Sequence, residues 1–322
     1  MRILLMLVFG VLGVGQCLAA DVYPSKPVHF IVFFGPGVPD DLIARALSQQ
    51  LAAQTGKTFI VENRTGASGA IGATYVAKSA PDGYTIGVVS TAWPATPLLN
   101  KAMPYNASRD FTPIMQTTRA PMVLVVSPAL KTDTLKDFIA LAQANPGKLN
   151  FGSAGPGSAI HLSEELFSLQ AKVKLGHVPY RGGSSEIMSA VIGGEVQMFM
   201  TQVPPVLAQI KAGRLRGLAV TTEANKRLSS LPEVPSMSEA GVPGLVIYNW
   251  GGLVGPAGLP TEIVNRLHAE FVKALAAPAV KDPIIAQGTE LVGSNPEEFA
   301  AYIRSEVQRW TEVIKSAGIT IE

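Results

Sequence analysis

Apolar residues recur along the chain with two different periods, which predict strands and helices in alternation. Short apolar runs of strand composition occupy residues 28–34, 58–62, 84–90, 123–127, 149–153, 196–201 and 215–221. Most of these runs are separated by segments whose apolar residues recur every three or four positions, the spacing of an amphipathic helix. This alternation predicts an α/β protein in which helices cover parallel sheets.

Several predicted helices have residues that favour their ends. Thr134 and Asp137 have the spacing of a capping box. Prolines stand where three other helices would begin: Pro39, Pro260 and Pro296. The last predicted helix spans residues 296–317, and its apolar residues should place one face on a core: Phe299, Ile303, Val307, Trp310 and Ile314.

The first 19 residues have the layout of a secretory signal peptide. Arg2 precedes an apolar run at residues 3–12, and small residues surround Ala19, after which we expect cleavage. A lipoprotein signal at Cys17 is the alternative, but Gln16 stands where a small residue is required. No segment approaches the ~20 apolar residues that cross a bilayer, so we expect a soluble, exported protein.

Composition narrows the function further. Cys17 is the only cysteine, and its loss with the signal would exclude thiol catalysis, disulfides and cysteine-ligated metal. Without Arg2 the 26 basic residues become 25, against 24 acidic ones, which leaves no electrostatic footprint for nucleic acid. The chain of 322 residues is longer than one core usually serves, so two lobes are expected.

Motifs for cofactors and catalysis are incomplete. Residues 56–58 resemble the end of a phosphate-binding loop, but Leu51 replaces the required glycine. Residues 35–37 lack the third glycine of a dinucleotide fingerprint, and G-x-S-x-G is absent from the sequence. The four histidines lack the spacing of metal ligands: His29, His161, His177 and His268. We therefore predict no cofactor, no metal and no catalytic residues.

Two glycine-rich turns lead from a predicted strand into a predicted helix. One is at residues 35–37, and the other, at residues 152–158, precedes a helix over residues 159–170. Each would present unpaired backbone N–H groups and the positive end of a helix at the carboxyl edge of a sheet. Two such edges in separate lobes could hold one small anion. His161 follows Ser158 in the first helical turn, either as a helix-start residue or as a ligand contact.

An ordered series of short motifs extends through essentially the whole mature chain. The first are Y-P-S-K-P at 23–27, F-G-P-G at 34–37 followed by Asp41 and Arg45, V-E-N-R at 61–64 and A-P-D-G-Y-T at 80–85. Later ones are M-P-Y at 103–105, P-G-K-L-N at 146–150, H-V-P-Y at 177–180, I-K-A-G at 210–213, L-P-E-V-P at 231–235 and P-E-E-F at 296–299. In this order and spacing the chain resembles the substrate-binding receptors of tripartite tricarboxylate transporters, the Bordetella uptake gene family.

The resemblance implies a periplasmic solute-binding protein with a two-lobed, type II-like α/β fold. Each lobe would be a largely parallel sheet flanked by helices, and two crossings would join the lobes. Lobe I would contain residues 20–121 and 243–322, and lobe II residues 122–242. The protein, expected to be a monomer, would deliver a small organic acid to the large and small membrane subunits of the transporter.

Two other functions are alternatives to transport. The same fold can present a ligand to a membrane sensor kinase, and the sequence does not separate this role from transport. An exported hydrolase or isomerase using His161 and Asp41 has little support, because no pair of residues is placed for acid–base chemistry.

The resemblance also implies the residues that contact the ligand: Phe34, Gly35, Pro36, Gly37, Asp40, Asp41, Ser90, Thr91, Trp93, Ser153, Gly157, Ser158, His161 and Thr201. Amides near Gly35 and Gly37 would meet one carboxylate, and the 153–158 turn would meet the other end. Charge-assisted bonds to fixed amides contribute about 1.5–3 kcal/mol each, so a carboxylate needs no arginine. Phe34 and Trp93 either flank the ligand or pack in the core.

The first turn departs from the family pattern. Relatives commonly have P-G-G-G, then threonine or serine, then aspartate, whereas residues 36–41 read P-G-V-P-D-D. Pro39 removes an amide donor, and Val38 resists positive φ. Asp40 and Asp41 either stabilise the start of the helix through its dipole or face the ligand. An acid that faces the ligand would favour an amine- or hydroxyl-bearing molecule.

A second departure lies at Thr201 and Gln197, where many relatives have acidic residues. Loss of negative charge there weakens the case for an amino-acid ligand. The first departure would favour a ligand with an amine or hydroxyl group, whereas the second makes an amino-acid ligand less favourable. The expected ligand is a carboxylate, and an aromatic or longer-chain acid fits as well as a short diacid.

Overall fold

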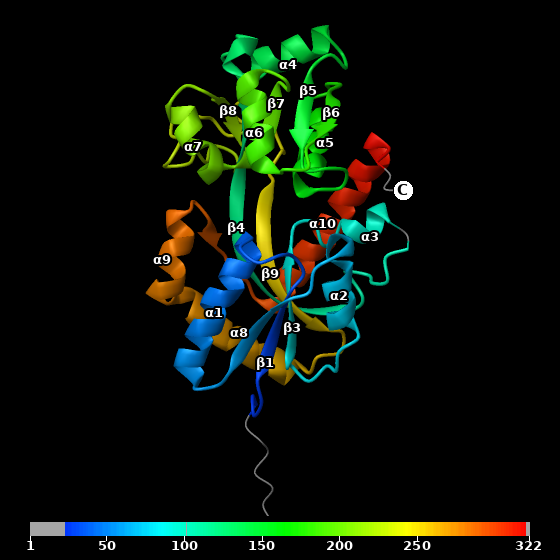
Figure 1. Cartoon of the computed structure of the whole chain (residues 1–322), viewed down its shortest axis with the longest axis vertical. Helices are drawn as coiled ribbons and strands as arrows, with labels where there is room; N and C mark the ends of the chain where they lie inside the picture. Colours follow the sequence, from blue (N-terminus) through cyan, green and yellow to red (C-terminus); the bar gives the residue numbers. More distant parts are fainter. Residues whose placement is uncertain (1–22, 101, 320–322) are drawn as a thin grey trace, which may run out of the picture.

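Two long strands run through the middle of the molecule and connect its two halves (Figure 1). The computed structural model describes residues 23–100 and 102–319, so the predicted signal peptide lies outside the described residues. Strands β4 (Phe111–Val126) and β9 (Tyr248–Pro256) pair antiparallel from Phe111 opposite Pro256 to Pro121 opposite Tyr248. The strand order is β2-β1-β3-β9-β4-β7-β5-β6, with β8 and β10 also paired to β4.

The lower half of Figure 1 contains β1 (Val28–Val32), β2 (Phe59–Asn63), β3 (Thr85–Ser90) and β10 (Glu290–Leu291). Its helices are α1 (Pro39–Thr55), α2 (Ala70–Ala77), α3 (Thr96–Leu99), α8 (Thr261–Ala276) and α9 (Pro278–Ala286), with a short turn η1 (Ala67–Gly69). Side chains alternate across β1: Phe30 lies in one core with α1 and α8, and Ile31 lies in another with α2. Helices therefore bury both faces of this sheet.

The upper half contains β5 (Asn150–Ser153), β6 (Gly176–Pro179), β7 (Met198–Gln202) and β8 (Arg216–Val220). Its helices are α4 (Leu135–Ala144), α5 (Ala159–Gln170), α6 (Ser184–Gly193) and α7 (Val203–Lys211), with η2 (Pro128–Leu130) after β4. Leu124 of β4 faces the core with α4 and α5, whereas Val125 faces the core with α6 and α7. The end of β4 thus belongs to the upper sheet.

The last helix, α10 (Pro296–Ala317), contributes to the cores of both halves. Its first turns bury Phe299 and Ile303 in the core that contains α2. Its later turns bury Trp310 and Val313 in the core that contains α4 and α5. Asn295 and Glu298 form a capping box at its start. Because its side chains are buried in both cores, α10 connects the two halves.

Most predicted elements occur where the sequence placed them. Six of the seven predicted strands are found within a few residues of their expected ends, and the seventh, at 123–127, is the last part of the longer strand β4. The helices over 159–170 and 296–317 have the predicted bounds. The capping box of Thr134 and Asp137 is confirmed. Pro260, however, precedes its helix as the N-cap residue instead of lying in the first turn.

The prediction of largely parallel sheets is wrong for the middle of the molecule. β1 pairs parallel with β2 and β3, and β5 pairs parallel with β6 and β7. Every pair that involves β4 or β9 is antiparallel. The chain runs through the middle in opposite directions along these two strands, so they pair antiparallel and each sheet is mixed.

Candidate functional site

A cavity of about 300 Å³ lies where the two halves meet. Its walls come from the starts of α1, α5 and α6, the ends of β3 and β7, the second half of β4 and the start of β9. Thirteen residues line it: Pro39, Thr91, Met122, Ala154, Ser158, Ala159, Ile160, Ser163, Ser184, Thr201, Gln202, Tyr248 and Asn249. None of the thirteen is charged, so hydroxyl, amide and main-chain groups supply its polarity.

Four helices begin at this cavity. Pro39 and Ser184 are the first residues of α1 and α6, and Ser158 and Gln202 are the N-cap residues of α5 and α7. The first amides of a helix lack partners within the helix and carry partial positive charge. The cavity is therefore suited to a small anion even though no basic side chain lines it.

The predicted turn at residues 153–158 is held by two histidines. The Gly157 N–H donates to His161 Nδ1 at 3.1 Å, and the His161 N–H donates to Ser158 Oγ at 3.2 Å. His177 Nε2 lies 2.6 Å from Ser153 Oγ. Ser158 lines the cavity, but Ser153 and His161 are 0% and 4% exposed. Ser153, Gly157 and His161 are not among the lining residues, and their hydrogen bonds position the turn.

His177, which sequence reasoning did not select, completes this support. Its ring stacks on that of His161 with the centroids 4.0 Å apart. Burial and the neighbouring His161 lower the pKa of His177 to about 4, against a smaller opposing effect of Glu165. A neutral His177 can pack against a second imidazole without charge repulsion, so the support persists at neutral pH.

In the first predicted turn, the Gly37 N–H donates its hydrogen bond to the nearby Asp41 side chain. Asp41 is 1% exposed and accepts hydrogen bonds from the Gly37 N–H at 2.9 Å, from Asn63 Nδ2 at 2.9 Å and from two Arg45 nitrogens at 3.0 Å. Burial alone would raise the pKa of Asp41, but these bonds hold it below its ordinary value. Asp41 thus has a structural role. It occupies the amide of Gly37, which was predicted to meet a carboxylate of the ligand.

Other predicted contacts lie near the cavity without lining it. Trp93 is 2% exposed and packs against Tyr105 and Phe111, so it lies in the core and does not line the cavity. Phe34 is partly buried beside Gly69. Asp40 and Ser90 are the chain neighbours of the lining residues Pro39 and Thr91, whereas Gly35 and Pro36 are not among the lining residues. Of the predicted set, Thr91, Ser158 and Thr201 line the cavity.

Thr91 fixes a neighbour that the sequence did not identify. Its Oγ1 accepts from the Trp250 N–H at 2.8 Å and donates to Asn249 Oδ1 at 2.9 Å. With its oxygen so engaged, Asn249 keeps its Nδ2 group for other acceptors. Further lining residues missed by sequence reasoning are Met122, Ser184, Gln202 and Tyr248, and no motif of the sequence marks them.

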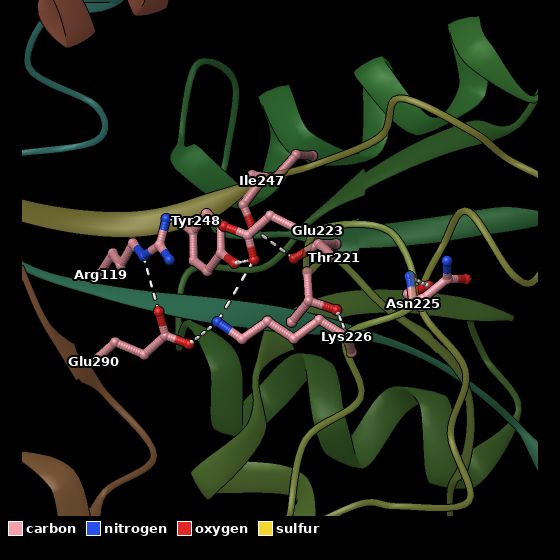
Figure 2. A network of polar contacts seen from close by, with 10 residues as sticks. Arg119, Thr221, Glu223, Asn225, Lys226, Ile247, Tyr248 and Glu290 are labelled. Carbon is pink, nitrogen blue, oxygen red and sulfur yellow. Dashed lines mark hydrogen bonds and ion pairs between the residues drawn. The ribbon is translucent and has the colours of Figure 1, made fainter.

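Tyr248 is held at the cavity by a charged network (Figure 2). Its hydroxyl donates to Glu223 Oε2 at 2.5 Å, and the Arg119 guanidinium lies 4.3 Å from its ring centroid. Arg119 pairs with Glu223 and with Glu290 of β10, and Lys226 pairs with Glu290 at 2.7 Å. The network joins β4 and β10 to the segment after β8, so it positions Tyr248 from both halves.

No metal site accompanies the cavity. Among residues 23–100 and 102–319, no three His, Cys, Asp or Glu side chains gather as metal ligands, and no helix is long and apolar enough to span a membrane. A larger hollow of about 810 Å³ beside α2 is lined by none of the predicted ligand contacts. This hollow is lined mainly by residues of α2 and of the segment that begins at Asn100.

Asp40 differs from Asp41 because no basic side chain contacts it among the described residues. Burial raises the pKa of Asp40 to about 7, and a hydrogen bond with Ser90 opposes the shift. The residue as a whole is only partly buried, although its carboxyl group lies deep in the protein.

We expect Asp40→Asn to stabilise the protein more at pH 8 than at pH 4.5. The folded state holds the proton up to about pH 7, whereas the unfolded chain releases it near pH 4. Wild-type stability should therefore fall between these values and stay low above them. A shift from 3.8 to about 7 sets an upper limit of about 4 kcal/mol, and partial accessibility should reduce the difference to roughly 1–2 kcal/mol.

Urea denaturation at the two pH values measures this difference. Glu297→Gln removes an exposed acid in the first turn of α10 and serves as the control. An Asp40→Asn effect of equal size at both pH values would show that the Asp40 carboxyl titrates normally.

Comparison with known proteins places the chain in a family. Residues 43–319 match the model of the tripartite tricarboxylate transporter family receptor, TctC. The chain is 39% identical to the UPF0065 protein in the tcbD-tcbE intergenic region of Pseudomonas sp. strain P51, over 91% of this chain and 87% of that protein. It is 35% identical to protein BugT of Bordetella pertussis, over 96% and 95% of the two chains.

Solved structures agree with this relationship. The structure of R. palustris Rpa4515 with adipate superposes with a TM-score of 0.76 at 33% identity, covering 92% of this chain and 99% of that one. This similarity shows the α/β fold of periplasmic binding proteins. The chain therefore belongs to the tripartite tricarboxylate transporter receptor family, whose members are solute-binding proteins and not enzymes.

Proposed function

We propose that this chain captures a small organic acid in the 300 Å³ cavity and delivers it, in the periplasm, to the large and small membrane subunits of a tripartite tricarboxylate-type transporter. Residues 20–121 and 243–322 would form lobe I and residues 122–242 lobe II, with the ligand between them. The later turns of α10 pack on lobe II, so this helix would connect the lobes. The observation that carries the proposal is the start of four helices at one uncharged cavity.

The upper wall supplies the donors for a carboxylate. The N–H groups of Ala159 and Ile160 in the first turn of α5 have no acceptor among the described residues. The hydroxyls of Ser158, Ser184 and Thr201 line the same cavity. Charge-assisted hydrogen bonds to such groups contribute about 1.5–3 kcal/mol each, so three or four suffice to bind a small acid.

A carboxylate is supported as the ligand class by the adipate in R. palustris Rpa4515 and by the absence of charge from the lining. Apolar walls formed by Met122, Ile160 and the Tyr248 ring suit an aliphatic or aromatic body. Presentation of the bound acid to a membrane sensor kinase is the second candidate role, because one closed complex can serve either partner.

A thermal-shift screen of the mature protein against organic acids, amino acids and sugars tests the ligand class. A ligand at ~100 times its Kd stabilises the folded protein by about 2.7 kcal/mol, which is easily detected. Shifts caused only by sugars or by amines without a carboxylate would refute the proposal. Co-purification with the permease subunits or with a sensor kinase separates the two roles.

Ser158→Ala is expected to weaken binding of the acid roughly tenfold, because it removes a hydroxyl donor from the cavity. The same change removes the N-cap of α5 and should cost about 1 kcal/mol of stability. Thr134→Ala removes the N-cap of α4, which does not reach the cavity, and is the matched control. Equal affinity losses in the two variants, by calorimetric titration, would assign the Ser158 effect to general destabilisation.

A further inference from the structure

The cavity has free hydrogen-bond donors on one wall and few on the other. We propose that the preferred ligand is a monocarboxylic acid with an apolar body, and that this body, in place of a second carboxylate, lies against the lower wall. Four lining residues form the lower wall: Pro39, Thr91, Tyr248 and Asn249. This inference rests on the proposed function, because it names the class of acid that the same cavity selects.

The side chains of the lower wall offer little to a second carboxylate. Pro39 is the residue of α1 that lines the cavity, and it has no N–H to donate. The Thr91 hydroxyl donates to Asn249 Oδ1 at 2.9 Å, and the Tyr248 hydroxyl donates to Glu223 Oε2 at 2.5 Å. The Nδ2 group of Asn249 is thus the one side-chain donor of this wall that is left for a ligand.

Basic side chains do not compensate for the missing donors. The Arg119 guanidinium lies 4.3 Å from the centroid of the Tyr248 ring, but it is paired with Glu223 and Glu290 and does not line the cavity. Burying an ionised carboxylate is costly unless it is paired and hydrogen-bonded. A diacid would therefore place one of its charges against a wall that stabilises it poorly.

The same wall suits an apolar body. Because its hydroxyl is engaged, Tyr248 offers a ligand its ring, and Pro39 adds an aliphatic ring. Met122 also lines the cavity and follows Pro121, which pairs with Tyr248. Thioethers and aromatic rings both make favourable contacts with apolar groups. A cavity of roughly 150 Å³ accommodates benzene, so about 300 Å³ leaves room for a ring or a short chain together with its carboxylate.

The upper wall, by contrast, keeps several donors free. The hydroxyls of Ser184 and Thr201 line the cavity and donate to no other residue in the described part of the chain. The N–H groups of Ala159 and Ile160, at the start of α5, lie on the same wall. The donors are therefore gathered at one end of the cavity, where a single carboxylate can use them.

Calorimetric titration of the mature wild-type protein at pH 8 with two matched pairs of acids tests the inference. The pairs are hexanoate with adipate and benzoate with terephthalate, in which the second acid has a carboxylate where the first has a methyl group or a hydrogen. The monoacid of each pair should bind at least roughly tenfold more tightly than the diacid. A diacid that binds as tightly as its monoacid, or more tightly, in either pair would overturn the inference.

Pro39→Ala tests the role of the lower wall. Alanine at the first position of α1 restores an N–H that has no partner within the helix. We expect the affinity for diacids to rise roughly tenfold relative to that for monoacids. Pro296→Ala makes the same change at the first position of α10, which does not line the cavity, and should leave the ratio unchanged. An unchanged ratio in Pro39→Ala would contradict the assignment of this wall.

The outcomes separate this inference from the proposed function. A preference for diacids would overturn the inference and leave the carboxylate receptor intact. Failure of all four acids, and of every other carboxylate in the thermal-shift screen, to bind would overturn both.

Discussion

Ala159→Pro is expected to weaken binding of the acid by roughly 10- to 100-fold while the fold stays intact. Ala159 is the first residue of α5, where proline is well tolerated because the N–H has no helical partner. The preceding residue, Ser158, has φ −63° and ψ 155°, which suits a residue before proline. The substitution thus deletes one amide donor from the cavity, worth about 1.5–3 kcal/mol to a carboxylate.

The matched control is Thr261→Pro, which places proline at the first position of α8, away from the cavity. Thermal denaturation should show both variants folded, and calorimetric titration should show an affinity loss for Ala159→Pro alone. An unchanged affinity in Ala159→Pro would mean that the α5 amide does not contact the ligand.

Trp310→Ala is expected to lower the free energy of unfolding by about 3–5 kcal/mol, the range for large aromatic residues removed from a core. Trp310 is buried among residues of α4 and α5 although its own helix starts in the lower half. Its Nε1 donates to Glu306 Oε2 at 3.1 Å, the atom that also accepts from Trp250 Nε1 at 3.0 Å. The variant loses both the packing and one donor to a buried carboxylate.

Trp310→Phe separates these two contributions, because it retains most of the apolar volume and loses only the donor. We expect it to cost about 1–2 kcal/mol in urea denaturation. A loss below about 1 kcal/mol for Trp310→Ala would show that the later turns of α10 add little to the upper core.

The sequence predicted the strands with short apolar runs but not the crossing strands. β9 contains Gly251, Gly252 and Gly255, which have low strand propensity. Gly252 is nevertheless required, because a Cβ there would lie 2.3 Å from the Phe299 ring. The first half of β4 includes Pro113 and several polar residues. Its sequence therefore lacks the pattern of a strand, although the second half of β4 is apolar. Long-range packing, absent from local patterns, decides these elements.

The candidate site was predicted in outline because glycine-rich turns before helices mark helix starts. Which amides remain available could not be predicted, since internal acceptors take some of them: Asp41 takes that of Gly37, and His161 takes that of Gly157. Asn249 and Tyr248 reach the cavity only through the pairing of β4 with β9. That pairing brings together segments more than 120 residues apart, so no local motif reveals it.

A crystal structure of the protein with its bound acid tests the central claim most directly. We predict carboxylate oxygens within about 3 Å of the main-chain nitrogens of Ala159 or Ile160 and of the Ser158 hydroxyl, with no arginine or lysine side chain in contact. A carboxylate paired with a basic side chain, or an acid bound in the hollow beside α2, would contradict it.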